Sequence, residues 1–207
     1  MKQYTPCPFV NMLVKKKRIP VKNITISDLQ HGIHSMNVFD ESLLTFIKYL
    51  IVTPAVNQLS SNGVISSLQD LIGLEHDISL SRLDKYQGDC ISFNKIHFEK
   101  LKDKSKNKTH LTLHDIAEYR KDLIQIARKN NPQFKFGIVE LIVSCGEDAF
   151  LQVLFSDETG DIRLEWITTF FTTENLPTRK DGFYRKNITF GEWIYAFITH
   201  LHNLHDI

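Results

Sequence analysis

The chain has 207 residues, with 25 lysines and arginines against 24 aspartates and glutamates, so its formal net charge at pH 7 is +1. Hydrophobic residues make up 42% of the sequence and charged residues 24%, which excludes a fully disordered, collagen-like or coiled-coil chain. The balanced charge offers no general attraction to nucleic acid or to an anionic membrane. The longest apolar stretch, residues 134–155, contains too many charges to span a membrane. This length predicts a single domain over residues 1–207 and leaves the oligomeric state open.

Apolar residues at helical spacing dominate the sequence, and strand-like alternation is short wherever it occurs. The spacing predicts helices over residues 26–38, 41–53, 64–74, 95–102, 113–129, 136–155, 162–173 and 190–205. Several of these begin with a Ser/Thr-x-x-acid capping box: Thr25 with Asp28, Thr112 with Asp115, and Thr189 with Glu192. The predicted fold class is therefore all-α, as a single-domain helical bundle.

The cysteine pattern argues against a disulfide scaffold or a zinc site. Cys7, Cys90 and Cys145 lie far apart and form no CxxC motif. The first ten residues lack the apolar core of a secretory signal peptide, so no export signal is expected in this chain. If the chain is secreted, Asn107, in a lysine-rich loop, is the plausible glycosylation site.

The first candidate for chemistry is Cys7, which has a proline on either side. The two prolines stiffen the backbone and remove two N–H groups, so we expect Cys7 to be held on a stiff loop. Free amides at Phe9 and Val10 would then point at the sulfur and favour the thiolate, the form that binds metals. The alternative is an ordinary buried cysteine in an N-terminal loop.

The second candidate is the segment from Glu75 to Asp84, which begins Glu75-His76-Asp77. Its carboxylates offer oxygen ligands to a metal ion, and its histidine offers an acid–base group. The alternative is a polar helix end that is stabilised by capping side chains and an Arg82–Asp84 ion pair.

The third candidate is Glu147, which lies within the most apolar helical pattern of the chain. Val143, Glu147 and Phe150 share one helix face. Burial would raise the pKa of Glu147, as a proton shuttle needs; the alternative is an exposed edge of an amphipathic helix. The histidines at 200, 202 and 205 are interpreted as a frayed helix end rather than a metal site.

These segments, in this order, resemble the haem-thiolate peroxidases, the family that contains fungal chloroperoxidase and the unspecific peroxygenases. The resemblance extends from Pro6 to about Thr189. The segments that carry it are Pro6-Cys7-Pro8 with Asn11, Glu75-His76-Asp77 with Ser79-Leu80-Ser81-Arg82 and Asp84, Gly88-Asp89 with Phe93-Asn94, Gly146-Glu147, and Trp166 with Phe170-Phe171, Glu174 and Leu176-Pro177.

The resemblance implies an all-α fold that encloses a b-type haem, with the thiolate of Cys7 as the axial ligand of the iron. It implies a Mg²⁺ ion bound by the Glu75 side chain, the His76 backbone carbonyl and the Ser79 hydroxyl. It also implies that Glu147 transfers the proton of hydrogen peroxide, that His76 orients Glu147 through a hydrogen bond, and that Asp77 holds His76.

The resemblance is to the short branch of the family, because the long peroxygenases have glycine in place of His76 and an arginine seven residues before the glutamate. That position holds Glu140 here, which we interpret as structural. Leu74, Val143 and Phe150 are expected to line the haem pocket, where a small apolar or aromatic substrate would bind.

The expected function is therefore that of a hydrogen-peroxide-dependent haem-thiolate peroxygenase or peroxidase. Two alternatives share the same haem: halide oxidation, and a non-catalytic protein that binds or senses haem. A third is a haem-free helical interaction module.

Overall fold

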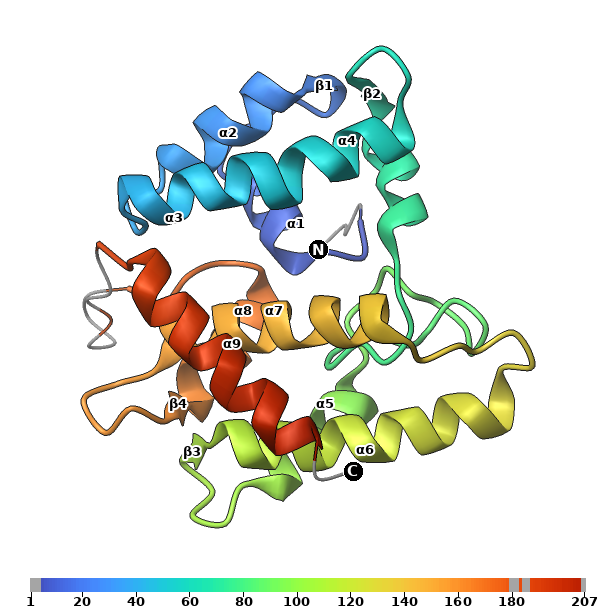
Figure 1. Cartoon of the computed structure of the whole chain (residues 1–207), viewed down its shortest axis with the longest axis vertical. Coiled ribbons are helices and arrows are strands. Elements are labelled where there is room, and N and C mark those ends of the chain that lie inside the picture. The colour runs from blue at the N-terminus through green and yellow to red at the C-terminus, as the bar shows by residue number, and fades with distance from the viewer. Residues whose placement is uncertain (1–4, 179–182, 184–186, 206–207) are drawn as a thin grey trace.

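The computed structural model describes residues 5–178, 183 and 187–205, while the side chains at 73, 74 and 205 lie outside this description. In Figure 1 the helix α7 runs across the middle of the molecule, with the N-terminal elements above it and α5 and α6 below it. Helices predominate and the strands are short, so the predicted all-α class is confirmed.

The N-terminal elements form the upper layer in Figure 1. In chain order they are α1 (Pro8–Lys15), β1 (Lys22–Thr25), α2 (Ile26–His34), α3 (Glu41–Phe46), the π-helix η1 (Ile47–Val52), α4 (Thr53–Leu59), β2 (Val64–Ser67) and the 3₁₀-helix η2 (Leu68–Leu74).

The remaining elements contain the longest helices of the described chain. They are α5 (Lys95–Lys104), β3 (His110–Leu111), α6 (Leu113–Asn130), α7 (Ile138–Phe155), β4 (Ile162–Arg163), α8 (Leu164–Thr173) and α9 (Phe190–His205). Helix α9 packs against both α7 and α6.

The capping boxes predicted from the sequence are all present. The side chain of Thr25 accepts a hydrogen bond from the Asp28 amide at the start of α2, and Thr112 accepts one from the Asp115 amide at the start of α6. The same exchange occurs between Thr189 and Glu192 before α9. Each box pairs amides that the first helical turn leaves without a partner, which explains why these helices begin where they do.

Three local predictions were wrong. Residues 64–67 form β2, which pairs antiparallel with β1, and only 68–74 are helical. The helix predicted over 41–53 continues to Leu59 through η1, because Pro54 is accommodated in the first turn of α4. The loop expected after Cys7 is the helix α1, for which Pro8 supplies the first turn.

An aromatic cluster joins the upper layer to α7 and α9. The ring centroid of Trp193 lies 4.5 Å from that of Phe46 on α3 and 5.5 Å from that of Phe150 on α7. Phe39, which precedes α3, also contacts Phe150 and Phe9. These contacts hold α1 over α7, so that the N-terminal cysteine faces the helix that carries Glu147.

Among the described residues, no helix is both long enough and apolar enough to cross a membrane.

Candidate active site

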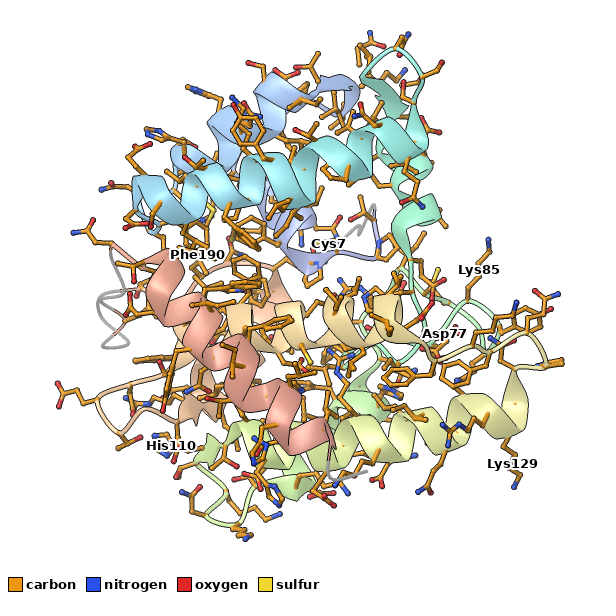
Figure 2. All side chains as sticks on the ribbon, viewed as in Figure 1. Cys7, Asp77, Lys85, His110, Lys129 and Phe190 are labelled. Carbon is orange, nitrogen blue, oxygen red and sulfur yellow. The ribbon has the colours of Figure 1, made fainter. Side chains whose placement is uncertain are left out.

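Cys7 lies immediately before α1 as its N-terminal capping residue, with an extended backbone (φ −84°, ψ 113°). In Figure 2 it lies between α1 and α7. Its side chain is solvent-accessible. Desolvation by the surrounding protein and the negative charge of Glu147 raise the pKa of the thiol, against hydrogen bonds from the Val10 and Phe9 amides that lower it. The two amides expected to face the sulfur are therefore the ones that do so.

The backbone around Cys7 is held by Thr5 and Asn11, both of which are fully buried. The Cys7 amide donates to the Thr5 hydroxyl over 3.2 Å, and the Thr5 amide donates to the Asn11 side-chain oxygen over 3.0 Å. The Asn11 amide group returns a 2.9 Å bond to the Thr5 carbonyl. These bonds fix the direction of the Cys7 side chain before any ligand binds.

A largely buried cluster of charged and polar side chains contacts this loop through Asn11. We call its members, Arg82, Glu174, Asn11 and Lys15, the Arg82 cluster. Arg82 Nη2 donates to Glu174 Oε1 over 3.0 Å, Asn11 Nδ2 donates to the same oxygen over 2.7 Å, and Lys15 pairs with Oε2. Arg82 and Glu174 are 1% and 0% exposed. The Arg82–Asp84 pair considered from the sequence is wrong, because Glu174, which is far away in the chain, occupies the guanidinium.

Glu147 lies on α7, and 47% of its side-chain surface is solvent-accessible. Its Oε1 lies 2.9 Å from His76 Nε2, so the hydrogen bond expected between these two residues is present. Its Oε2 accepts a 3.1 Å bond from Arg120 Nη2 on α6. Desolvation acts to raise the pKa of Glu147, but the attraction of His76 and Arg120 outweighs it and lowers the pKa. The raised pKa expected for this carboxyl is therefore wrong.

His76 is held by the backbone of Asp77 rather than by its carboxylate. His76 Nδ1 lies 3.0 Å from the Asp77 carbonyl oxygen, whereas the Asp77 carboxylate accepts a 2.9 Å bond from Asn131 Nδ2. Although desolvation opposes it, the charge of Glu147 raises the pKa of His76 to about 9. At neutral pH the imidazole is therefore protonated, and it donates to Glu147.

The carboxylates of Glu75, Asp77 and Asp84 gather within 4.8 Å of one another. Burial and the neighbouring charges raise the pKa of Asp84 to about 6, and burial also raises the pKa of Glu75. Ser79 lies in the same loop, and its carbonyl oxygen lies 3.0 Å from His97 Nε2. Three like charges repel one another in this arrangement unless a proton or a cation intervenes, and carboxylate oxygens are the donors that Mg²⁺ prefers.

A pocket of about 730 Å³ opens beside this acidic group, and its lining includes Glu75, His76, Asp77, Tyr86 and Glu140. Figure 2 shows Asp77 and Lys85 at the side of the molecule opposite to Phe190, whose ring stacks on Trp193. The Glu140 carboxylate accepts a 2.9 Å bond from the Gly137 amide at the start of α7, in agreement with a structural role for this residue.

The residues expected to line the haem pocket differ in their surroundings. Val143 is 38% exposed on the half of α7 that precedes Glu147, where Val139 and Ile142 are also exposed. Phe150 is partly buried in the aromatic cluster. The side chain of Leu74, at the end of η2, lies outside the described part of the structure.

Three functional candidates were missed by sequence reasoning: Arg120, Asp148 and His200, each of which is 0% exposed. Arg120 forms a double hydrogen bond with Asp148, with distances of 3.0 and 2.7 Å, and His200 Nε2 lies 2.8 Å from Asp148. His200 is thus part of the interior, and its assignment to a frayed helix end is wrong. A signal did exist, because Arg120 falls between Ile116 and Ile124 on the apolar row of its helix.

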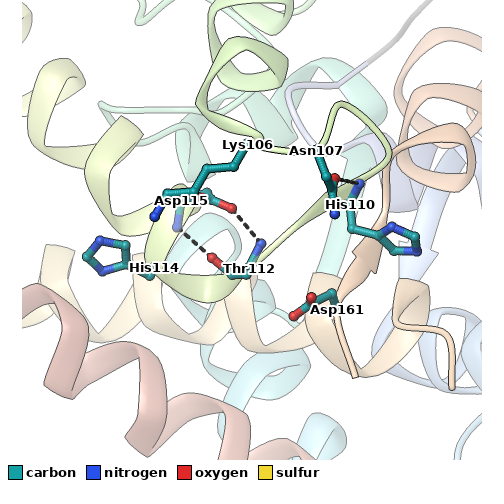
Figure 3. Close-up of a pocket in the computed structure, with 7 residues that line it drawn as sticks. All are labelled: Lys106, Asn107, His110, Thr112, His114, Asp115 and Asp161. Carbon is teal, nitrogen blue, oxygen red and sulfur yellow. Dashed lines mark hydrogen bonds between the residues drawn. The ribbon is translucent and has the colours of Figure 1, made fainter. Parts of the chain in front are cut away.

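A second pocket, of about 220 Å³, lies at the start of α6 and contains none of the predicted catalytic, haem-binding or metal-binding residues. Figure 3 shows that two of its lining residues, Thr112 and Asp115, are bonded to each other's backbone amides. These bonds belong to the capping box of α6, so the polar side chains of Thr112 and Asp115 in this pocket are explained by helix capping.

All three cysteines are described, and all three are free. Cys145 is fully buried in α7, as expected of a packed helix residue. Burial raises the pKa of its thiol to about 12.

Comparison with known proteins identifies the family of the chain. A family model described as peroxidase, family 2, matches residues 2–188. An aromatic peroxygenase from Cyclocybe aegerita is 26% identical over 209 aligned positions, which cover 87% of this chain and 54% of the relative. The chain thus spans about half the length of that curated relative. Because the family model matches nearly the whole chain, the protein belongs to peroxidase family 2, and the resemblance to the haem-thiolate peroxidases is confirmed.

Proposed function

We propose that this protein is a hydrogen-peroxide-dependent haem-thiolate peroxidase or peroxygenase that acts on small apolar or aromatic substrates. The observation that carries the proposal is that Cys7 lies between α1 and α7, within reach of the charge of Glu147, whose carboxylate is hydrogen-bonded to His76 and open to solvent. Membership of a peroxidase family and the likeness to an aromatic peroxygenase support it.

The residues around Cys7 fit a haem iron. The side chain is accessible, its backbone is fixed by Thr5, and two amides face the sulfur. Amides in this arrangement stabilise a metal-bound thiolate, so Cys7 would hold the iron, with Val143 and Phe150 expected beside the macrocycle. Once bound, a haem thiolate supplies the electron-rich iron that favours cleavage of the peroxide O–O bond.

Glu147 would carry the proton in this reaction. Its pKa is lowered, so at neutral pH it is a carboxylate ready to accept the proton of hydrogen peroxide. It would then donate that proton to the peroxide oxygen that leaves as water. His76 stays protonated with its pKa at about 9 and holds one carboxylate oxygen in place.

The acidic group would bind Mg²⁺. Glu75 was expected in this role together with the His76 carbonyl and the Ser79 hydroxyl, and the geometry adds the carboxylates of Asp77 and Asp84 to the available donors. Burial and the repulsion from Asp77 raise the pKa of Asp84, and a divalent cation there would offset the repulsion. Because His76 lies in the same loop, the ion would also fix the residue that orients Glu147.

The substrate class follows from the surface of α7. Val139, Ile142 and Val143 leave apolar side chains exposed in the two turns that lead to Glu147. A substrate that covers this surface would be apolar, and removing the surface from water would contribute to its binding.

The test begins with the absorption spectrum of the haem-loaded protein, reduced and bound to carbon monoxide. We expect a strongly red-shifted Soret band that is lost in Cys7→Ala and kept in Cys90→Ala, the matched control at a cysteine outside the Pro6-Cys7-Pro8 motif. Glu147→Gln should keep the band and lose peroxide turnover.

Other results would favour the alternatives. A thiolate band without peroxide turnover in the wild type would indicate a haem-binding or sensing protein. Turnover of halide in place of organic substrates would indicate a haloperoxidase, and the absence of haem uptake would indicate a helical interaction module.

A further inference from the structure

Arg120 contacts two neighbouring residues of α7 that differ in their exposure. Its guanidinium donates through Nε and Nη2 to the two oxygens of Asp148, over 3.0 and 2.7 Å. Nη2 also donates to Glu147 Oε2 over 3.1 Å, and Nη1 donates to the Ile78 carbonyl. Arg120 and Asp148 are completely buried, whereas Glu147 is open to solvent.

The two hydrogen bonds with Asp148 form an ion pair that already balances the buried charge of Arg120. The bond to Glu147 is therefore additional, and it runs from the interior to the solvent-accessible carboxylate. With His76 on Oε1 and Arg120 on Oε2, both oxygens of Glu147 are held by donors from different parts of the chain. A carboxylate held at both oxygens has one orientation, whereas one held at a single oxygen can turn about its terminal torsion.

The anchor of the Arg120 guanidinium, Asp148, has a further buried partner. Asp148 is contacted by His200 Nε2 at 2.8 Å, from α9. Arg120 and His200 keep the pKa of Asp148 at about 2 in spite of its burial, so the residue that anchors Arg120 stays charged. We call Arg120, Asp148, His200, Glu147 and His76 the Arg120 cluster.

We propose that Arg120 is the positioning residue for Glu147, anchored by Asp148 and His200. The inference rests on the proposed function, in which Glu147 moves the proton of hydrogen peroxide. In this chain an arginine from α6 reaches the Glu147 carboxylate, while the position seven residues before Glu147 on α7 is occupied by Glu140, whose carboxylate accepts a hydrogen bond from the Gly137 amide.

The test compares variants that differ in the charges they leave in the protein interior. Arg120→Gln alone would leave the buried carboxylate of Asp148 with only His200 as a charged partner and would destabilise the protein for reasons unrelated to catalysis. The double variant Arg120→Gln/Asp148→Asn removes both charges together. Arg120→Lys keeps the charge but loses the planar fork that serves two partners. Arg128→Gln, an exposed arginine on the same helix, is the matched control.

Two measurements on the haem-loaded ferric protein separate positioning from folding. The first is the rate constant for cyanide binding, because hydrogen cyanide must give its proton to a nearby base as it binds. The second is the pair kcat and KM for hydrogen peroxide. We expect both the cyanide rate and kcat/KM to fall roughly 10²-fold in the double variant, with the Soret band and the KM of the organic substrate unchanged. Arg120→Lys should fall between the double variant and the wild type.

Unchanged cyanide and peroxide rates in a folded double variant would overturn the inference. If the double variant does not fold, Arg120→Lys provides the test. Wild-type cyanide and peroxide rates in Arg120→Lys would show that the planar guanidinium is not needed to position Glu147, and this would overturn the inference. A wild type that binds no haem or turns over no peroxide would instead overturn the proposed function, and this would be seen before any variant is made.

Discussion

Two buried arginines each hold a glutamate in this molecule, and the two pairs differ in what the glutamate can reach. In the Arg82 cluster, Glu174 is 0% exposed and is bonded to Arg82, Asn11 and Lys15. In the Arg120 cluster, Glu147 is bonded to Arg120 and His76, yet 47% of its side-chain surface is accessible. The same arginine–glutamate pairing therefore leaves one glutamate enclosed in the interior and the other accessible to solvent.

The backbone supports this distinction. Glu174 adopts a left-handed conformation (φ 52°) at the end of α8, which costs energy for a residue other than glycine and persists only where the surroundings impose it. Glu147 lies within a regular helix. The Arg82 cluster joins α1, the 81–91 loop and α8 into a rigid support for Cys7, whereas the Arg120 cluster presents one carboxylate to the space beside α1.

The comparison predicts that loss of the two glutamates will affect different properties. The largest effect is expected for Glu147→Gln, which should lower peroxide turnover by roughly 10²–10⁴-fold because an amide cannot accept and return the proton. Its free energy of unfolding should change little, since the carboxylate is partly exposed. Steady-state kinetics and urea unfolding measure the two quantities, with Glu165→Gln on the exposed surface of α8 as the control.

Glu174→Gln should do the opposite. Without the carboxylate, Arg82 and Lys15 are left as uncompensated charges in the interior, which should cost roughly 3–5 kcal/mol of stability. The protein that remains folded should turn over peroxide with nearly normal kcat. A stable variant with a depressed kcat would contradict the division of tasks between the two clusters.

A pH titration of the haem-free protein sharpens the comparison. The pKa of His76 is raised from 6.5 to about 9 in the folded state, so its stabilising contribution is complete below pH 6.5 and is lost as the pH rises through about 9. Because the pair is partly exposed, the effect should be on the order of 1 kcal/mol. Thermal unfolding between pH 6 and pH 10 should show this loss in the wild type and a smaller loss in Glu147→Gln.

The smallest effect is expected at the start of α6, the helix that carries Arg120. Thr112→Ala removes the hydroxyl that accepts from the Asp115 amide and should cost about 1 kcal/mol of unfolding free energy. Since the cap lies two turns from Arg120, kcat should stay at the wild-type value. A loss of activity that exceeds the loss of folded protein would mean that α6 positions Arg120 less rigidly than its contacts indicate.

Much of the secondary structure followed from local signals. Thr25, Thr112 and Thr189 each marked a helix start correctly, because a capping box is complete within four residues. The strand β2 was missed, because its pairing with β1 is a contact between segments about forty residues apart. Helix α1 was missed because Pro8 was interpreted as a loop residue, although proline is also favoured in the first turn of a helix.

The residues of the candidate site fall into the same two groups, those expected from short motifs and those found only in the structure. Cys7, His76 and Glu147 were proposed as site residues from the sequence alone because each lies in a short segment that resembles a motif of the family. Asp77 was correctly expected to hold His76, but through its carboxylate, whereas its backbone carbonyl makes the contact. A sequence motif does not show which atoms of a residue form a hydrogen bond. Arg120 as the second partner of Glu147 and Glu174 as the partner of Arg82 were not identified, because the packing of the helices brings these residues together from distant parts of the chain.

By itself, then, the sequence determined the helical class, the helix starts and the short motifs, because these depend on residues within a few positions of one another. Only the tertiary structure decided which carboxylate each arginine holds, that His200 lies in the interior, and that Glu147 has a lowered pKa. Charge interactions depend on distance and burial in space. Both are set by the packing of α6, α7 and α9, and no local pattern encodes them.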